Sequence, residues 1–79
     1  MATARVNYSA NSFWAGWLQL PIGETKKVRD ELMDGLGIAS WEGFRKRRAG
    51  MVDHSPSEAR FIESVFAQYG ITEVWGDRK

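Results

Sequence analysis

The residues best placed to do chemistry in this 79-residue sequence are four consecutive basic side chains, Arg45 to Arg48. Together with Glu42 they give the segment 40–52 a net charge of +3, whereas the whole chain carries only +1. Guanidinium groups match phosphate oxygens and the acceptor edge of guanine with paired hydrogen bonds. A basic patch on a nearly neutral domain is what phosphate contact at one surface would need, although a solvated helix face would have the same composition.

Other kinds of catalytic or metal site find little support in the sequence. The chain has no Cys, which excludes disulfides, thiolate zinc sites and Cys nucleophiles, and its single His cannot build a His-rich metal site. That residue, His54, stands beside Asp53 just before a helix start, so we expect it to have a role in a loop. The acidic residues show no pair at catalytic or metal-binding spacing, and the glycines are dispersed. We expect no enzymatic activity, no metal and no cofactor.

The length predicts a single domain spanning residues 1–79, because independent domains usually contain about 100–150 residues. Hydrophobic residues make up 43% of the chain, which is ordinary for a soluble globular protein. The longest apolar stretch, residues 13–22, is interrupted by Gly16, Gln19 and Pro21 and is far shorter than the roughly 20 residues that span a bilayer. The N-terminal residues lack the pattern of a secretory signal. We therefore expect a soluble, cytoplasmic protein.

The spacing of apolar residues is helical through most of the chain, whereas the alternation typical of strands is brief. We predict an all-α fold, a small four-helix domain with helices at about 11–19, 24–36, 40–49 and 56–69. A short ordered C-terminal tail, residues 71–75, follows a glycine stop and is too short for another helix. We expect this tail to pack back on the domain with Trp75 as its anchor.

The last predicted helix has the most distinct limits. Ser55 and Glu58 have the spacing of a capping box, and Pro56 fits the first helical position, where its missing amide hydrogen costs nothing. Gly70 followed by Ile71 is typical of a helix C-terminus at which a glycine adopts the left-handed conformation, here called a glycine end, with Ile71 folding back onto the helix. Between these limits, one apolar stripe contains Phe61, Ile62, Val65, Phe66 and Tyr69.

The second predicted helix ends in the same way, since Gly37 and Ile38 repeat the pattern of the later glycine end. Its apolar stripe contains Val28, Leu32, Met33 and Leu36. Gly35 lies in its interior, where Gly costs about 1 kcal/mol relative to Ala. We interpret Gly35 as a position where another helix approaches closely.

A three-residue turn joins the second predicted helix to the third. The second helix closes at Leu36, the chain passes through residues 37–39, and Ser40 is a suitable N-cap for a new helix. Trp41 and Phe44 then lie on one face of that helix. Turns of three to four residues join the two helices of a helix-turn-helix, so the sequence predicts this motif here.

The segment 31–50, continued by residues 56–59 and 69–71, resembles the helix-turn-helix domains of phage repressors and their bacterial relatives. In that family, a helix ending in Leu-Gly-(Val/Ile) precedes the turn, and a recognition helix and a further core helix follow. The chain is also similar to a group of short, mostly unassigned bacterial helix-turn-helix proteins, through residues 20–24 and 74–76. The resemblance implies sequence-specific binding of double-stranded DNA by a transcriptional regulator of bacterial or mobile-element origin, with residues 40–49 as the recognition helix.

Two positions differ from the family pattern. Met33 stands where the family has a small residue, and Phe44 takes a core position one residue later than counting from Gly37 places it. Either the turn is one residue longer or the recognition helix is rotated, and the two alternatives turn different basic side chains toward the groove.

The resemblance implies that the outer face of the third helix contacts DNA. Arg45 and Arg47 are the first candidates for base edges or phosphates, while Lys46 and Arg48 are expected to contact phosphates. The full set of predicted DNA-binding residues is Ser40, Trp41, Glu42, Arg45, Lys46, Arg47 and Arg48. The alternative is a protein-interaction module that keeps the fold without binding DNA.

A second copy of the chain is the other expected partner. A single DNA-reading module buries only about 600–1,000 Å² of protein surface, so a nearly neutral monomer should bind specific DNA weakly. Phe13, Trp14 and Trp17 near one end, with Val74 and Trp75 near the other, offer material for a homodimer interface. Alternatively, these side chains complete the core of a short chain.

Overall fold

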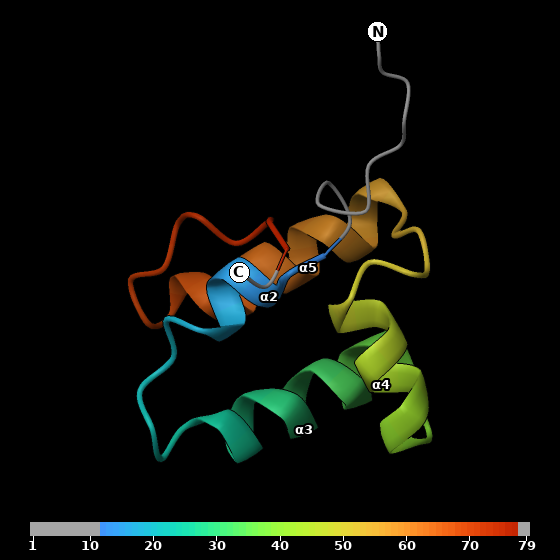
Figure 1. Cartoon of the computed structure of the whole chain (residues 1–79), viewed down its shortest axis with the longest axis horizontal. Coiled ribbons are helices and arrows are strands. Elements are labelled where there is room, and N and C mark those ends of the chain that lie inside the picture. Colours follow the sequence, from blue (N-terminus) through green and yellow to red (C-terminus); the bar gives the residue numbers. More distant parts are fainter. Residues whose placement is uncertain (1–11, 78–79) are drawn as a thin grey trace, which may run out of the picture.

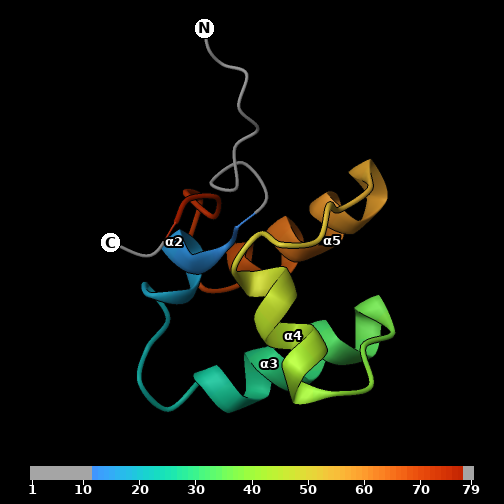
Figure 2. The same cartoon turned by 45° about the vertical axis from the view of Figure 1, so that its right-hand side comes forward.

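The computed structural model describes residues 12–77, which form four helices and one isolated β bridge between Phe13 and Gly76. Helices α3 and α5 lie across from each other, α4 follows α3 at one end, and α2 lies beside the C-terminal tail (Figures 1 and 2). The helices are α2 (Trp14–Trp17), α3 (Thr25–Leu36), α4 (Trp41–Arg48) and α5 (Pro56–Ala67). The predicted all-α fold is therefore confirmed. Within residues 12–77, no helix combines the length and the apolar character needed to cross a membrane.

Large apolar side chains from α3, α4, α5 and the segments around them form the core. Phe13 is fully buried at its centre, with its ring centroid 5.9 Å from that of Phe44 and 6.0 Å from that of Phe66. Tilted and edge-on ring pairs of this kind are favourable beyond the apolar area that they bury. The other buried apolar residues are Leu20, Val28, Leu32, Ile62, Val65, Ile71 and Val74. Aromatic rings thus fill the middle of a core that must be built from few residues.

Local signals set both ends of α5. The Ser55 hydroxyl accepts a hydrogen bond from the Glu58 amide at 3.2 Å, and the Glu58 carboxylate accepts one from the Ser55 amide at 3.1 Å, so the predicted capping box is confirmed. The helix ends at Ala67 instead of the predicted residue 69, because the amides of residues 68–70 bond carbonyls three residues earlier in place of the four of an α-helix. Gly70 then adopts a left-handed φ of 75°, and the Ile71 amide bonds the Phe66 carbonyl at 3.2 Å.

Helix α3 begins at Thr25 and ends at Leu36, close to the predicted range 24–36. Gly37 has a left-handed φ of 70°, and the Ile38 amide bonds the Met33 carbonyl at 2.8 Å, which confirms the predicted glycine end. The expected close approach at Gly35 is also confirmed, because a Cβ there would overlap the ring of Phe61 on α5. Gly35 therefore lets α3 and α5 pack against each other.

Helix α2 corrects the prediction of a helix at 11–19, because only Trp14–Trp17 are helical and residue 11 lies outside the described residues. Backbone groups before the helix bond other segments: the Phe13 amide bonds the Arg48 carbonyl at 3.1 Å, and the Gly76 amide bonds the Ser12 carbonyl at 2.8 Å. The Gly16 amide bonds the Val74 carbonyl, so the helical hydrogen bond between residues 12 and 16 is not made. At the other end, the amides of residues 19 and 20 bond carbonyls three residues earlier, at 3.0 and 3.2 Å, so the α-helical pattern does not continue.

The C-terminal tail packs back on the domain as expected, but its buried anchor is Val74 and not Trp75. Val74 is 2% exposed, whereas Trp75 is half-buried and its indole N–H donates to the Glu63 carboxylate at 2.6 Å. The Gly16 amide bonds the Val74 carbonyl at 2.9 Å, and a Cβ on Gly16 would lie 3.0 Å from the Val74 Cα. The backbones of α2 and the tail therefore touch, which turns the Val74 side chain inward.

A buried hydroxyl joins three separate parts of the chain. Ser12 is fully buried, and its hydroxyl donates toward two carbonyl oxygens. Its Oγ lies 2.8 Å from the carbonyl oxygen of Arg48 and 3.0 Å from that of Gly76. The same oxygen accepts a hydrogen bond from the Trp14 amide at 3.2 Å. The start of α2, the end of α4 and the C-terminal tail are held together at this point.

Candidate nucleic-acid interface

The turn between α3 and α4 fixes which face of α4 points outward. Ser40 is extended, with φ −130° and ψ 153°, and its hydroxyl accepts the Gly43 amide at 3.1 Å, so the predicted N-cap is confirmed. A Cβ at Gly43 would lie 3.1 Å from the Ile38 side chain, so the turn packs closely against the first turn of α4. In this arrangement Phe44 is fully buried. The opposite face of α4 is left to solvent.

The predicted DNA-binding residues fall into two groups in the structure. Five are exposed, namely Ser40, Trp41, Glu42, Arg45 and Lys46, whereas Arg47 and Arg48 are partly buried. Glu42 and Lys46 lie one turn apart, with the carboxylate oxygen and the ammonium nitrogen separated by 3.9 Å. Ion pairs as exposed as this one contribute little to stability, so both side chains can reorient at small cost.

Arg47 faces α5 instead of extending from the outer face of α4. Its guanidinium contacts the Glu58 carboxylate at 3.2 Å, and its side chain is only 20% exposed. The pKa of Glu58 is lowered, first by the hydrogen bond from the Ser55 amide and further by Arg47. This one carboxylate closes the capping box of α5 and binds a side chain of α4. Arg47 therefore helps to hold α4 in its orientation.

Arg48 lies among aromatic rings between α4 and α2. Its guanidinium carbon is 3.9 Å from the centroid of the Trp14 ring and 5.3 Å from that of Trp17. Cations over aromatic faces are attracted by the ring quadrupole, and a positive charge at the C-terminal end of a helix also interacts favourably with the helix dipole. Arg48 thus connects the end of α4 to α2.

Trp41 is 46% exposed and does not share the buried position of Phe44. Its ring stacks on that of Phe44, with centroids 5.4 Å apart and an angle of 18° between the planes. The guanidinium of Arg29, from α3, lies 5.4 Å from the Trp41 ring centroid. Trp41 therefore covers the core with one face and leaves part of its surface accessible at the start of α4.

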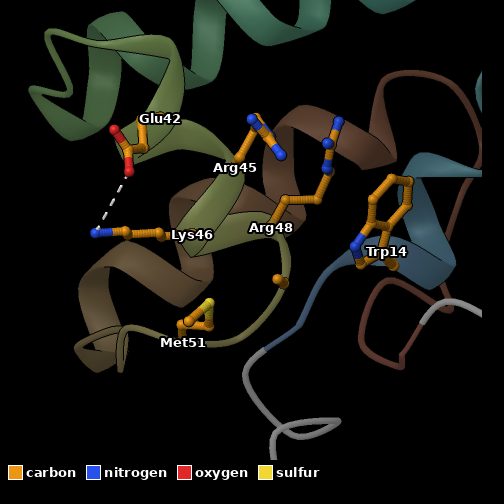
Figure 3. A pocket seen from close by; sticks show the side chains of 7 residues that line it. Trp14, Glu42, Arg45, Lys46, Arg48 and Met51 are labelled. Atoms are coloured by element: carbon orange, nitrogen blue, oxygen red, sulfur yellow. Dashed lines mark ion pairs between the residues drawn. The ribbon is translucent and has the colours of Figure 1, made fainter.

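A hollow of about 390 Å³ opens beside the outer face of α4. Figure 3 shows Arg45 and Arg48 extending to the same side, with Arg48 between α4 and Trp14, while Glu42 and Lys46 face each other nearby. The lining residues are Trp14, Glu42, Arg45, Lys46, Arg48, Ala49 and Met51. Three basic groups and one acidic group leave this hollow positively charged.

Trp14 and Met51 were not among the predicted site residues. Met51 is 64% exposed in the segment after α4, and Trp14 is contributed by α2 from more than 30 positions earlier in the chain. Nothing in the spacing of the sequence connects Trp14 to Arg45 or Lys46, and its place at the hollow follows from the packing of α2 against the end of α4. Met51 is placed locally, because it follows the left-handed Gly50 and its amide bonds the Lys46 carbonyl at 3.0 Å.

His54 lies in the loop before α5, as expected, but inside an aromatic setting. Its ring centroid is 6.1 Å from that of Phe13 and 5.9 Å from that of Trp75, and both ring nitrogens are buried without a hydrogen-bond partner among the described residues. Burial lowers the pKa of His54 below 6.5, and the charge of Arg47 lowers it further. The imidazole is therefore held in its neutral form as a packing group.

The terminal aromatic residues mostly complete the core, as the alternative to a dimer interface predicts. Phe13 and Val74 are buried, and Trp17 and Trp75 pack against the core from its edge. The apolar side chains that remain well exposed nearby are Leu18 and Ile22, in the segment between α2 and α3.

Residues 12–77, the part of the chain that the structure describes, contain no group of three or more His, Asp or Glu side chains able to hold a metal ion. Comparisons with models of known families, with curated proteins and with solved structures find no match for this chain.

Proposed function

We propose that this chain binds double-stranded DNA as a sequence-specific transcriptional regulator, with α3 and α4 as a helix-turn-helix and α4 as the recognition helix. The observation that carries the proposal is the orientation of α4. This helix buries Phe44 and leaves Glu42, Arg45 and Lys46 exposed on its outer face, with Ser40 exposed at its N-cap. The short turn after α3 and the Ser40 cap support the same assignment.

The dimensions of α4 suit a major groove. An α-helix with its side chains is about 10–12 Å across, so α4 (Trp41–Arg48) can enter the major groove of B-DNA, which is about 12 Å wide. The first residues of a recognition helix contact base edges, so we assign Ser40, Trp41 and Glu42 to that role. Arg45 suits the acceptor edge of guanine or a phosphate, and Lys46 suits a phosphate.

The small charge of the chain limits the affinity of one copy. Binding strength rises with the number of phosphates neutralised, and of the four basic residues of α4 Arg45 and Lys46 are exposed whereas Arg47 and Arg48 are partly buried. A homodimer would place two α4 helices in successive major grooves about 34 Å apart, and we include it in the proposal. Sedimentation that shows only monomer at about 100 μM, with and without a duplex of two half-sites, would exclude it.

The test begins with selection of bound sequences from a random pool of duplex DNA, followed by fluorescence anisotropy on the selected duplex at several salt concentrations. Arg45→Ala and Lys46→Ala should each weaken binding, and a lost phosphate contact should reduce the slope of log K against log salt by about 0.9. Lys27→Ala is the matched control, because it removes one exposed positive charge from α3.

Two results would contradict the proposal. The first is that no duplex is enriched and no salt-dependent binding occurs near 100 mM salt. The second is that Lys27→Ala weakens binding as much as Arg45→Ala, since this would show a general charge effect with no special role for α4.

A protein-interaction module is the second candidate, and the exposed side chains of Leu18 and Ile22 favour it. They are 57% and 94% exposed, and both lie in the short segment between α2 and α3. If the chain binds no duplex and Leu18→Ser abolishes self-association or capture of a purified protein partner, this candidate replaces the first.

A further inference from the structure

The hollow beside α4 combines two chemical characters that a nucleic-acid backbone also combines. One side presents the cationic groups of Arg45, Lys46 and Arg48. The other presents apolar surface, from the indole of Trp14 and the side chain of Met51. A phosphodiester joins an anionic phosphate to apolar sugar carbons, so both surfaces would find a counterpart in one nucleotide unit.

We propose that this hollow seats one phosphate group of a nucleotide strand, beside the base-reading residues of α4; the inference rests on the proposed DNA-binding function. Arg45 and Arg48 extend to the same side of α4, as Figure 3 shows. The Glu42 carboxylate lies 3.9 Å from the Lys46 ammonium, and it is the one acidic group in a lining that contains three basic groups. Guanidinium groups bind phosphate oxygens through short, charge-assisted hydrogen bonds.

The position of the hollow along α4 favours a backbone phosphate over a base. Its lining residues extend from Glu42 to Met51 and so include the C-terminal half of the helix and the residues after it. Bases are contacted mainly by the first residues of a recognition helix, whereas the flanks of the helix meet the sugar-phosphate strands that border the groove. The wall that α2 adds through Trp14 lies on such a flank.

Trp14 acts in this site as a positioning residue. Its ring centroid is 3.9 Å from the Arg48 guanidinium carbon, so the indole fixes the guanidinium at the edge of the hollow. The backbone of this part of α2 is itself tied to the end of α4, through the Phe13 amide and the Arg48 carbonyl. Helix α2 thus helps to build the hollow.

Met51→Glu tests the phosphate seat without disturbing the fold, because Met51 is 64% exposed and makes no contribution to the core. Thr72→Glu is the matched control, since it introduces a negative charge at an exposed position of the C-terminal tail, outside the hollow. Melting followed by circular dichroism checks that both variants fold. We expect Met51→Glu to weaken binding of the selected duplex about tenfold or more and Thr72→Glu to change it less than about twofold.

A second measurement separates a strand phosphate from a free nucleotide. The indole N–H signal of Trp14 is followed by NMR during titration with the selected duplex, with thymidine 5′-monophosphate and with inorganic phosphate. If the duplex binds and shifts the Trp14 signal, and Met51→Glu but not Thr72→Glu weakens duplex binding, the phosphate seat is supported. If the duplex binds while the two variants behave alike, the seat is wrong and the proposed function stands.

Loss of the proposed function has a different signature. If no duplex binds the wild-type chain but thymidine 5′-monophosphate shifts the Trp14 signal, and Met51→Glu removes that shift, the hollow is a seat for the phosphate of a free nucleotide and the DNA-binding proposal is wrong. If no duplex binds and neither the nucleotide nor inorganic phosphate shifts the Trp14 signal, both proposals are overturned.

Discussion

Replacing Gly35 with Ala tests the contact that holds α3, the first helix of the proposed motif, against α5. Two opposing effects meet at this position. Alanine favours a helix interior by about 1 kcal/mol over glycine, so the local effect of the change is stabilising. The new methyl group, however, would overlap the Phe61 ring and would lie 2.9 Å from its Cε1 atom.

The overlap outweighs the gain in helix propensity. Carbon atoms in contact prefer separations of about 3.5–4.0 Å, so the Phe61 ring must move by roughly 1 Å or more to admit the methyl group. Overpacking of this kind typically costs about 1–3 kcal/mol. With the gain of about 1 kcal/mol subtracted, Gly35→Ala should lower the free energy of unfolding by about 0–2 kcal/mol, and the melting temperature by roughly 4–8 °C for each kcal/mol lost.

The assay is urea denaturation of four proteins: wild type, Gly35→Ala, Phe61→Leu and the double variant. Phe61→Leu removes the outer ring atoms that the methyl group would meet. In that background Gly35→Ala should become stabilising by up to about 1 kcal/mol. Gly23→Ala, at a position with no atom within 4 Å of the added Cβ, should change stability by less than about 0.5 kcal/mol. The reasoning is refuted if Gly35→Ala stabilises the wild type, or if Phe61→Leu does not alter its effect.

Three further predictions address the elements that position α4. Ser12→Ala removes the buried hydroxyl shared by α2, α4 and the tail, and should cost about 1–3 kcal/mol by thermal melting, whereas the exposed Ser64→Ala should change little. Ser40→Ala should cost about 1 kcal/mol through loss of the α4 cap, and equal stability of this variant would contradict the assigned cap. His54, which faces Arg47, Glu58 and Asp53, has a folded-state pKa below 6.5. The free energy of unfolding should therefore be at its full value above about pH 7 and should fall as the pH drops toward that pKa, because the unfolded chain then binds the proton more readily. His54→Phe should abolish this part of the pH dependence, and an unchanged profile in the variant would show that another group causes it.

The helix limits were predictable because the signals for them are local. The capping box of Ser55 and Glu58, the cap of Ser40 and the left-handed glycines at 37 and 70 all act over three to six residues, and each was confirmed. The outward face of α4 was partly predictable in the same way, since helical spacing alone separates Phe44 from Arg45 and Lys46.

The surroundings of the candidate site were not predictable, because they depend on residues that are far apart in the sequence. Arg47 meets Glu58, and Arg48 meets Trp14, only because α5 and α2 pack on either side of α4. Helical spacing predicts the direction in which a side chain leaves the helix, but it does not predict which residue of another segment that side chain contacts. Two of the four consecutive basic residues are therefore held within the domain, which their sequence could not indicate.

The sequence by itself thus determined that the chain forms helices, the limits of three of them to within two residues, and that a glycine would lie where α3 meets another helix. The tertiary structure decided the rest: the single turn of α2, the inward position of Val74 and the hollow between Trp14 and α4. The physical reason is the range of the interactions. Caps and glycine ends are satisfied by atoms a few residues away, whereas α2 and the tail satisfy their backbone groups with partners about 60 residues distant, so their conformation exists only once the domain has closed.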